Sequence, residues 1–383
     1  MPYSFTPEAR VSQTPLSLRW DTRHLWQALQ MEFGGNEATV AVILALFTSD
    51  GWLSYSRRKA HYTRPARYRS RLYTYARIVG AVDFLDRQGL LEHDRRRPGH
   101  RGWQSAMKAA PELVARTKKV LFGCPRLEIA RPTETLLLRD ADRELIDYRD
   151  DETTVRMRRS LEEFNEAIRR TDISDNVASP MARIFNRTFH RGGRFYALGG
   201  GWQSMKKELR QRITISGEPV VEIDYKTLHP AILYAQAGAR LPDDAYEIEG
   251  WPRALVKLAL LVLINAPNRA SARLAIANHD TMACIAALGT QDAMATADRL
   301  IEEVKCVHRP IAGAFHSDSG AAIMSLDSAL AETVMHLMLR LGVLVLPIHD
   351  SFLVPASKAE LLEEAMLKAA HEAGFVALRI AYS

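Results

Sequence analysis

The sequence predicts an α+β protein of more than one domain. Its 383 residues correspond to two or three domains at roughly 100–200 residues each. Amphipathic helical patterns such as Thr153–Arg170 share the chain with β-branched apolar runs such as Val220–Tyr225. The apolar fraction is 47% and the charged fraction 25%, ordinary globular values that exclude a disordered or fibrous chain.

Basic charge is concentrated in the first third of the chain. Residues 1–130 contain 21 Lys and Arg against 11 Asp and Glu, whereas the remainder has a small acidic excess. A local excess of this size indicates a polyanionic partner, most often nucleic acid.

Residues 1–124 follow the element order of a winged helix-turn-helix. A short apolar helix at Glu37–Phe47 precedes a strand at Trp52–Tyr55, the basic segment Arg57–Arg71 and a helix at Thr74–Gln88 that Gly89 would terminate. A hairpin with a basic tip follows. In such a module a helix enters the major groove and the wing contacts phosphates. The alternative is a helical domain with a solvated basic face. The expected nucleic-acid contacts are Arg57, Arg58, Lys59, Arg95, Arg96 and Arg97.

Residues 125–183 are expected to form a helical connector, which would serve as a thumb. Its clearest element is the amphipathic helix Thr153–Arg170.

Two acidic residues stand at predicted strand ends in residues 184–383. Asp224 ends an apolar strand just before a helix that His229-Pro230 opens, and Asp350 lies at the tip of a tight hairpin within Val343–Val354. Carboxylates on adjacent strand ends can hold two divalent cations that align a 3′-hydroxyl with a triphosphate. Mg²⁺, or Mn²⁺ in its place, suits this task.

The apolar helix Trp251–Ala266 presents Arg253 and Lys257 on one face, four residues apart. A triphosphate would supply the anion that such a pair needs. The simpler alternative is that both side chains extend to solvent.

Four segments together resemble the superfamily of family A DNA polymerases and phage-type single-subunit RNA polymerases. DYKTLH (Asp224–His229) resembles the first palm motif, and IHDSF (Ile348–Phe352) is similar to the second. Arg253, Lys257 and Asn265 fall at the intervals of the fingers helix, and RGGRFY (Arg191–Tyr196) resembles an upstream segment of the RNA polymerases. The resemblance covers roughly residues 185–383. It implies a right-hand polymerase palm with minimal fingers, since only a short stretch separates the motifs.

The resemblance also implies roles for individual residues. Asp224 and Asp350 would bind the metal, and Lys257 would be catalytic as a proton donor to pyrophosphate. Nucleotide contacts would come from Arg253, Lys257, His229, Tyr225, Asn265 and Arg194. Nucleic-acid contacts would come from His349, Arg191, Lys206 and Lys207. The partners would be nucleic acid and nucleoside triphosphates.

Two departures from the family pattern leave the product open between DNA and RNA. Asn265-Ala266 replaces the Tyr-Gly that ends the fingers helix, and His229 replaces the Glu that excludes a 2′-hydroxyl in the DNA enzymes. No segment resembles a proofreading exonuclease.

Other features have competing interpretations. The pairs His279-Asp280 and His349-Asp350 would suit a metal phosphohydrolase, but the second lies in a predicted hairpin. Gly199–Gly201 is either a turn or a phosphate cradle. His316, Asp318 and Asp327 are candidates for primer contacts or caps of the following helix.

The sequence thus predicts a metal-dependent nucleotidyltransferase that extends a 3′ end, such as a primase-like replicase of a mobile element. The competing class is a non-enzymatic replication initiator or repressor with a degenerate palm. The longest apolar run, Ala259–Ala266, is too short for a membrane span, and the N-terminus has no apolar core. Three scattered cysteines fit a reduced compartment, so we expect a cytoplasmic protein without a membrane partner.

Overall fold

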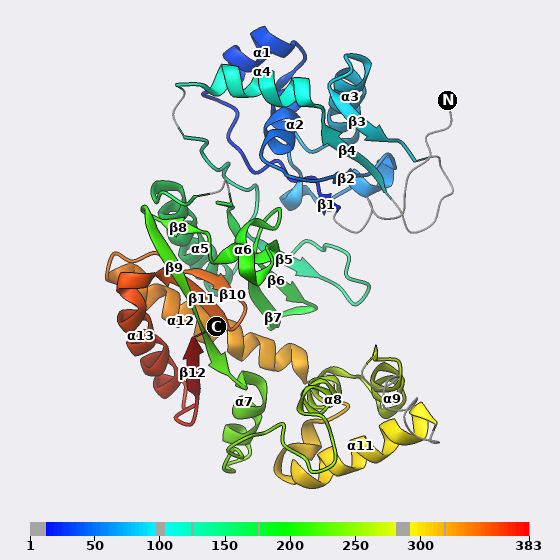
Figure 1. Ribbon diagram of the computed structural model, residues 1–383, viewed down its shortest axis with the longest axis vertical. Helices are drawn as coiled ribbons and strands as arrows, with labels where there is room; N and C mark the ends of the chain where they lie inside the picture. The colour runs from blue at the N-terminus through cyan, green and yellow to red at the C-terminus, as the bar shows by residue number, and fades with distance from the viewer. Residues whose placement is uncertain are drawn as a thin grey trace. The chain divides into compact units, whose positions relative to one another are not determined.

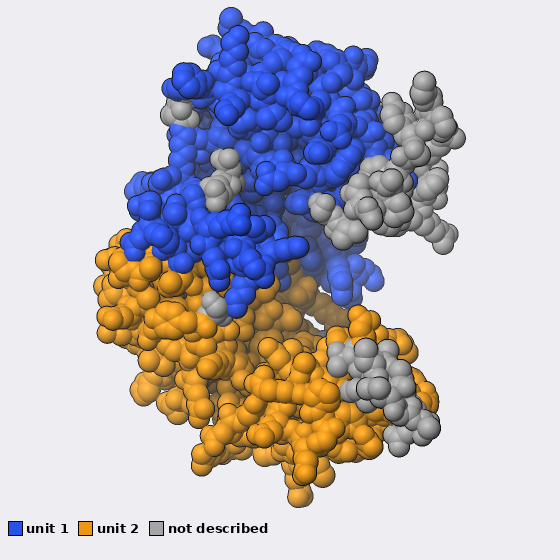
Figure 2. Space-filling view, in the orientation of Figure 1, with its two compact units in different colours: residues 1–183, 196–220 blue, residues 184–195, 221–383 orange. Residues whose placement is uncertain are grey.

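The computed structural model describes residues 13–96, 104–123, 126–174, 177–280, 292–317 and 319–382. The chain forms two compact units, coloured separately in Figure 2. Unit 1 consists of residues 1–183 and 196–220, and unit 2 of residues 184–195 and 221–383. Helices and several separate sheets confirm the mixed helix-and-strand class. The three-part division at residues 124 and 183 stays a prediction.

The first part of unit 1 packs helices against a small sheet of order β1-β2-β4-β3 (Figure 1). Strand β4 pairs antiparallel with both β2 and β3. Two short 3₁₀ turns, Lys59–Tyr62 and Ala66–Tyr68, occupy the basic segment. The other elements are β1 (Thr14–Pro15), α1 (Trp26–Phe33), α2 (Glu37–Phe47), β2 (Leu53–Tyr55), α3 (Tyr75–Arg87), β3 (Leu91–Asp94), β4 (Ser105–Ala109) and α4 (Pro111–Leu121).

Local sequence sets the ends of these helices. Asn36 caps α2 in a reciprocal capping box with Thr39, and the apolar run behind it is buried. Thr74 caps α3 through its side chain, which accepts from the N–H of Arg77. Gly89 follows α3 with a φ of 69°, as a terminating glycine should.

The remainder of unit 1 is built around helix α5 (Glu152–Arg170), which Asp151 caps in a second capping box. Asn165 on its buried face brackets the backbone of Met181: Oδ1 accepts from the N–H at 2.6 Å and Nδ2 donates to the carbonyl at 3.0 Å. Strands β5 (Leu136–Arg139), β6 (Met181–Asn186) and β7 (Thr188–Ala197) form a three-stranded sheet in that order, and residues 184–195 of the last two strands belong to unit 2. A 3₁₀ turn (Gly201–Ser204), α6 (Lys207–Arg210) and β8 (Thr214–Ile215) follow.

Unit 2 contains a sheet of order β10-β11-β9-β12, with β8 pairing to the start of β9. Helix α13 packs on β11 and β12, α12 packs on α13 and α7, and α8, α9 and α11 pack together. The elements are β9 (Glu218–Lys226), α7 (Leu228–Gln236), α8 (Arg253–Asn265), α9 (Arg269–Ala277), α11 (Ala293–Val307), α12 (Gly320–Arg340), β10 (Leu346–Ile348), β11 (Ser351–Pro355), α13 (Ala359–Glu372) and β12 (Arg379–Tyr382).

Helix α12 is long and apolar enough to cross a membrane by length and composition, which the search for apolar runs did not detect. Its packing against α7, α8 and α13 gives its apolar side chains protein partners. Core helices of this kind pass the same test, so the helix by itself is weak support for a membrane span.

Candidate active site

Neighbouring strands of the unit 2 sheet bring the two predicted carboxylates together. Asp224 lies in β9, two residues before the strand ends. Asp350 lies in the two-residue turn between β10 and β11, because Ile348 pairs with Ser351. The N–H of Tyr225 donates to the carbonyl oxygen of Asp350 at 3.1 Å. Two residues far apart in the sequence therefore become backbone neighbours.

The surroundings of these two carboxylates favour a cation. Oδ1 of Asp224 is buried, and no hydrogen bond reaches it from the described part of the chain. Burial raises the pKa of Asp350, and the negative charge of Asp327 raises it further. A nearby positive charge would stabilise both ionised groups.

The protein itself does not complete a metal cluster. Within the described ranges, no group of three or more His, Cys, Asp or Glu side chains is arranged to hold an ion. Two carboxylates remain a donor set that Mg²⁺ accepts when phosphate oxygens and waters fill its other positions. The residues present therefore fit a magnesium ion that arrives with its substrate.

A buried ion network lies beside the carboxylates. Asp327 of α12 is 1% exposed and accepts from Arg194 of β7, at 2.7 Å from Nε and 2.5 Å from Nη2. Burial alone would raise the pKa of Asp327, but the interactions with His229 and Arg194 outweigh it and hold the pKa below its usual range. The sequence left Asp327 open between a helix cap and a primer contact. The structure makes it the partner of Arg194.

Glycines place Arg194 where it can reach Asp327. Gly192 and Gly193 in β7 have φ values of 81° and 83°, which other residues rarely adopt. A Cβ on Gly193 would come within 2.5 Å of the Phe185 ring. The RGGR segment thus supplies both cations and the two glycines that its backbone conformation requires.

His229 of α7 carries a polar atom without a partner. Its Nε2 lies 3.0 Å from Nη2 of Arg194 and 3.7 Å from Oδ2 of Asp327. When Nε2 accepts from the guanidinium, the ring proton is on Nδ1. Nδ1 is buried, and no described group accepts from it. An unsatisfied buried donor costs about 1–3 kcal/mol, which a bound acceptor would recover.

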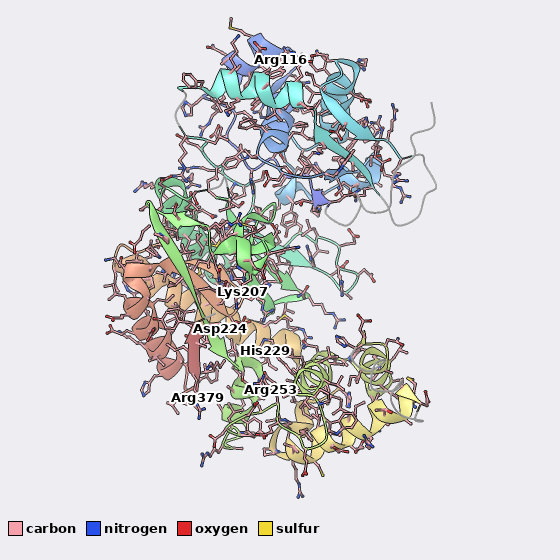
Figure 3. The ribbon with its side chains drawn as sticks, in the orientation of Figure 1. Arg116, Lys207, Asp224, His229, Arg253 and Arg379 are labelled. Atoms are coloured by element: carbon pink, nitrogen blue, oxygen red, sulfur yellow. The ribbon has the colours of Figure 1, made fainter. Side chains whose placement is uncertain are left out.

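The two cationic side chains of α8 both lie near the ring of Tyr246. The Arg253 guanidinium lies 5.0 Å and the Lys257 ammonium 5.8 Å from the ring centroid of Tyr246. Arg253 also pairs with Asp244 at 2.7 Å, an internal anion that the sequence pattern did not reveal. Lys257 is exposed, and among the described residues it has no ion-pair partner. Figure 3 labels Asp224, His229 and Arg253, which follow one another along β9, α7 and α8.

Tyr246 is a buried residue beside the two cations of α8. It is 5% exposed, and burial raises its pKa, with smaller contributions that include the charge of Asp350. Sequence reasoning missed Tyr246 because a single tyrosine in a loop between two helices carries no pattern.

The expected nucleotide contact of Tyr225 is wrong. Tyr225 is 2% exposed, and its hydroxyl donates to the carbonyl of Met366 in α13 at 2.6 Å. Adjacent residues of a strand point to opposite faces, so Tyr225 enters the core while Asp224 does not share that face.

Asn265 contacts its own helix and the start of α12. Its Nδ2 donates to the carbonyl of Leu261 at 2.7 Å, and its Oδ1 fills the place that a Cβ on Gly320 would need. The structure shows no separate nucleotide-facing role for it.

The remaining predicted contacts separate into two groups. Arg191 and His349 belong to unit 2, where desolvation, followed by the charge of Arg194, lowers the pKa of His349. His349 has a φ of 59° in the hairpin turn. Lys206 and Lys207 belong to unit 1 and are exposed there.

Two predicted nucleic-acid contacts in the first module are engaged internally, which corrects the expectation that they face a ligand. Arg57 pairs with Asp83 of α3 at 2.6 Å, and Arg96 pairs with Asp94 at 2.9 Å. The Arg57 guanidinium bridges two segments of the module, whereas that of Arg96 pairs within the end of its own strand. Among the predicted contacts, Arg58, Lys59 and Arg95 are exposed. Arg97 and Asp318 lie outside the described residues.

Comparison with solved structures finds distant likenesses. The fold is similar to the POL domain of Pol1 from M. smegmatis, solved in complex with DNA primer-template and dNTP, with a TM-score of 0.35 and 12% identity. The match covers 61% of this chain and 51% of that one, so the chain spans about half the length of the structure it matches. No protein-family model and no curated protein matches the sequence.

Proposed function

We propose that the chain is a metal-dependent nucleotidyltransferase that adds nucleotides to a nucleic-acid 3′ end. The observation that carries the proposal is the pairing of β9 with the β10–β11 turn, which joins Asp224 to Asp350 through the backbone bond of Tyr225. Oδ1 of Asp224 is buried and has no hydrogen-bond partner among the described residues, and burial raises the pKa of Asp350. A metal-bound substrate would supply the positive charge that these two carboxylates need.

Asp224 and Asp350 would hold Mg²⁺ together with the triphosphate. The ion would neutralise charge on the phosphates and on the leaving group. Lys257 is exposed and would bind the triphosphate, with Arg253 joining it by exchanging Asp244 for phosphate.

His229 would contact the incoming nucleotide through its unsatisfied Nδ1–H. Arg194 would act by positioning, since its guanidinium is committed to Asp327 and His229. On this proposal Arg194, predicted as a nucleotide contact, has a supporting role instead. It leaves the choice between deoxyribose and ribose to the experiment below.

We also propose that residues 13–123 form a winged-helix module that binds duplex nucleic acid. Support comes from the order β2-β4-β3, with α2 before β2 and α3 before the β3–β4 hairpin. In this module α3 would enter the major groove. Arg58, Lys59 and Arg95 are exposed and would contact phosphates. The same module supports the second candidate, an initiator or repressor that binds DNA without catalysis.

Primer extension tests the proposal. The full chain is incubated with a primed template, Mg²⁺ or Mn²⁺, and either dNTPs or NTPs. Asp224→Asn and Asp350→Asn should abolish incorporation, and Lys257→Ala should lower it by about 10²–10³, the usual cost of losing one preorganised electrostatic group.

Asp243→Asn is the matched control, because Asp243 is a 77% exposed carboxylate of the same unit. If no nucleotide is incorporated by the wild type while duplex binding persists, the non-catalytic alternative holds. Equal activity in wild type and Asp224→Asn would exclude the assigned site.

A further inference from the structure

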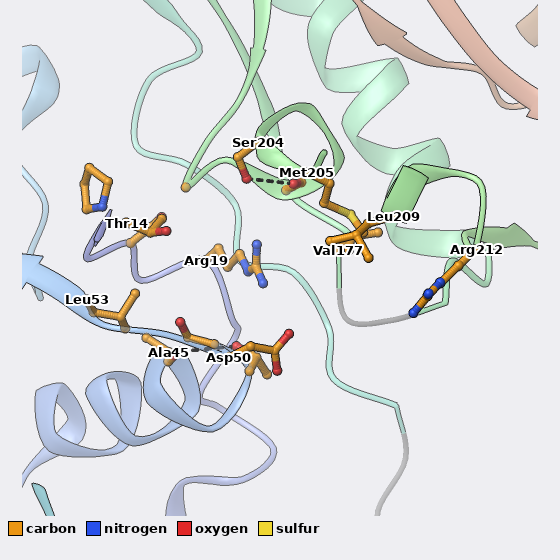
Figure 4. Close-up of a pocket in the computed structure, with 16 residues that line it drawn as sticks. Thr14, Arg19, Ala45, Asp50, Leu53, Val177, Ser204, Met205, Leu209 and Arg212 are labelled. Carbon is orange, nitrogen blue, oxygen red and sulfur yellow. Dashed lines mark hydrogen bonds between the residues drawn. The ribbon is translucent and has the colours of Figure 1, made fainter. Parts of the chain in front are cut away.

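Unit 1 contains a cavity of about 540 Å³ that the proposed function does not use (Figure 4). Its walls come from the β1–β2 region and the end of α2 on one side, and from Val177 and residues 199–212 on the other. The volume lies within the roughly 300–1,000 Å³ of small-molecule sites.

A glycine loop forms one wall. Gly199, Gly200 and Gly201 all have positive φ, at 81°, 92° and 44°. A Cβ on Gly199 would lie 2.5 Å from Ser17, and one on Gly201 would lie 2.8 Å from the carbonyl oxygen of Val177. The loop is therefore a tightly packed turn whose backbone conformation requires glycine.

The same loop offers hydrogen-bond donors. Gly199 and Gly201 line the cavity, and no hydrogen bond recorded within the described ranges uses the N–H of either residue. Backbone N–H groups without a protein acceptor need another partner, and an anion is a strong one.

Arg19 supplies a guanidinium to the cavity. Its Nη1 donates to Oγ of Ser179 at 3.1 Å, and the group lies 4.9 Å from the ring centroid of Trp20. Burial lowers the pKa of Arg19 to about 10, so the group stays cationic at neutral pH but is poorly solvated. A desolvated cation gains more from an anionic ligand than one in water. Arg212 adds an exposed guanidinium at the edge, and Asp50 is the carboxylate in the lining.

The remaining wall is mixed in character. Hydroxyl side chains such as Ser17 and Ser204 alternate with the apolar side chains of Leu53, Met205 and Leu209. A ligand with both a phosphate and an apolar ring system uses both kinds of surface, whereas a bare inorganic anion uses only the first.

We propose that this cavity binds a nucleoside phosphate, with its phosphate at Arg19 and the glycine loop and its base on the apolar wall. The nucleotide is either free or the terminal residue of a nucleic-acid strand, since both present the same chemistry. The site belongs to unit 1 and does not depend on Asp224 or Asp350.

Isothermal titration calorimetry of the full chain tests this site. The measurements use Lys257→Ala protein in EDTA, so that the triphosphate site proposed in unit 2 does not contribute. The probes are ATP, dATP, inorganic phosphate, and hexathymidylate with either a 5′-phosphate or a 5′-hydroxyl. Nucleotides should bind one per chain, and Arg19→Gln should weaken binding about tenfold to a hundredfold, the range for hydrogen bonds to a charged group.

Two further variants separate binding from folding. Leu209→Trp fills the cavity from a residue that is 40% exposed, and it should also abolish binding while thermal unfolding stays unchanged. Arg23→Gln removes a nearby surface guanidinium that is 73% exposed and pairs with Asp21, and it should bind as the parent does. If Arg19→Gln does not fold, Leu209→Trp decides the result.

Tighter binding of the 5′-phosphorylated strand than of ATP would assign a strand end, and the reverse order would assign a free nucleotide. Three results would overturn the proposal: no binding of any nucleotide, binding that survives both Arg19→Gln and Leu209→Trp, or inorganic phosphate binding as tightly as the nucleotides.

Discussion

Replacing Asp327 by Asn should destabilise unit 2 through the loss of one buried charge. The Asp327 side chain is 2% exposed and that of Arg194 is 18% exposed, so solvent screens their attraction weakly. Asn keeps a hydrogen-bond acceptor but removes the anion, which leaves the Arg194 guanidinium without its counter-charge. Breaking a buried pair by removing one partner costs about 3–5 kcal/mol, and the retained acceptor reduces this to about 2–4 kcal/mol.

The measurement is hydrogen exchange of α12 and β7 peptides in increasing urea, because a chain of two units need not unfold in one step. At a slope of about 2 kcal/mol per molar, the midpoint of unit 2 should fall by about 1–2 M. A double-mutant cycle with Arg194→Met should give a coupling energy of at least about 2 kcal/mol.

The pair Arg253 and Asp244 provides the matched control. It joins the same kinds of group, but the Arg253 side chain is 60% exposed, so its cycle should give less than about 1 kcal/mol. A coupling energy for Arg194 and Asp327 as small as that of the control would refute the reasoning, since burial would then confer no added strength on the ion pair.

Three further changes have defined outcomes. Gly193→Ala should cost about 1–3 kcal/mol, measured by urea unfolding, because its φ of 83° and its closeness to the Phe185 ring leave no place for a methyl group. Unchanged stability would contradict this close packing. Burial opposes ionisation of Glu134, but Arg158 and backbone N–H groups outweigh it and hold the pKa of Glu134 below the usual 4.5. A carboxylate whose pKa is lowered by folding stabilises the protein above its unfolded pKa, and this stabilisation is lost as the pH falls through the folded pKa. Glu134→Gln should therefore be less stable than wild type at pH 7 by about 1–3 kcal/mol, and the two should become equally stable in strong acid. A stability difference that does not change with pH would exclude the ion pair as its cause. Arg58→Gln and Arg95→Gln should each reduce the slope of log binding constant against log salt for duplex DNA by about one, and an unaltered slope would remove that residue from the interface.

Local sequence predicted many of the elements of this fold correctly. The helices at Glu37–Phe47 and Tyr75–Arg87 begin after capping side chains and follow apolar periodicity, so their information lies within a few residues. The hairpin at Asp350 was readable for the same reason, since its turn lies between two apolar runs. Asp327, a candidate cap in the sequence, lies inside α12, because this helix begins at Gly320 without a side-chain cap to mark its start.

The sequence by itself determined that the chain has a basic first third, and it singled out Asp224 and Asp350 as acids at or near strand ends. Only the tertiary structure decided which groups surround them. Arg194 and Asp327 are 133 residues apart in the sequence. No local sequence pattern relates the strand that carries Arg194 to the helix that carries Asp327. Likewise Arg57 and Arg253 read as free cations, until folding placed Asp83 and Asp244 beside them. Capping, turns and amphipathic faces depend on neighbours along the chain, whereas ion pairs and buried partners depend on neighbours in space, and those are fixed only when the strands and helices pack.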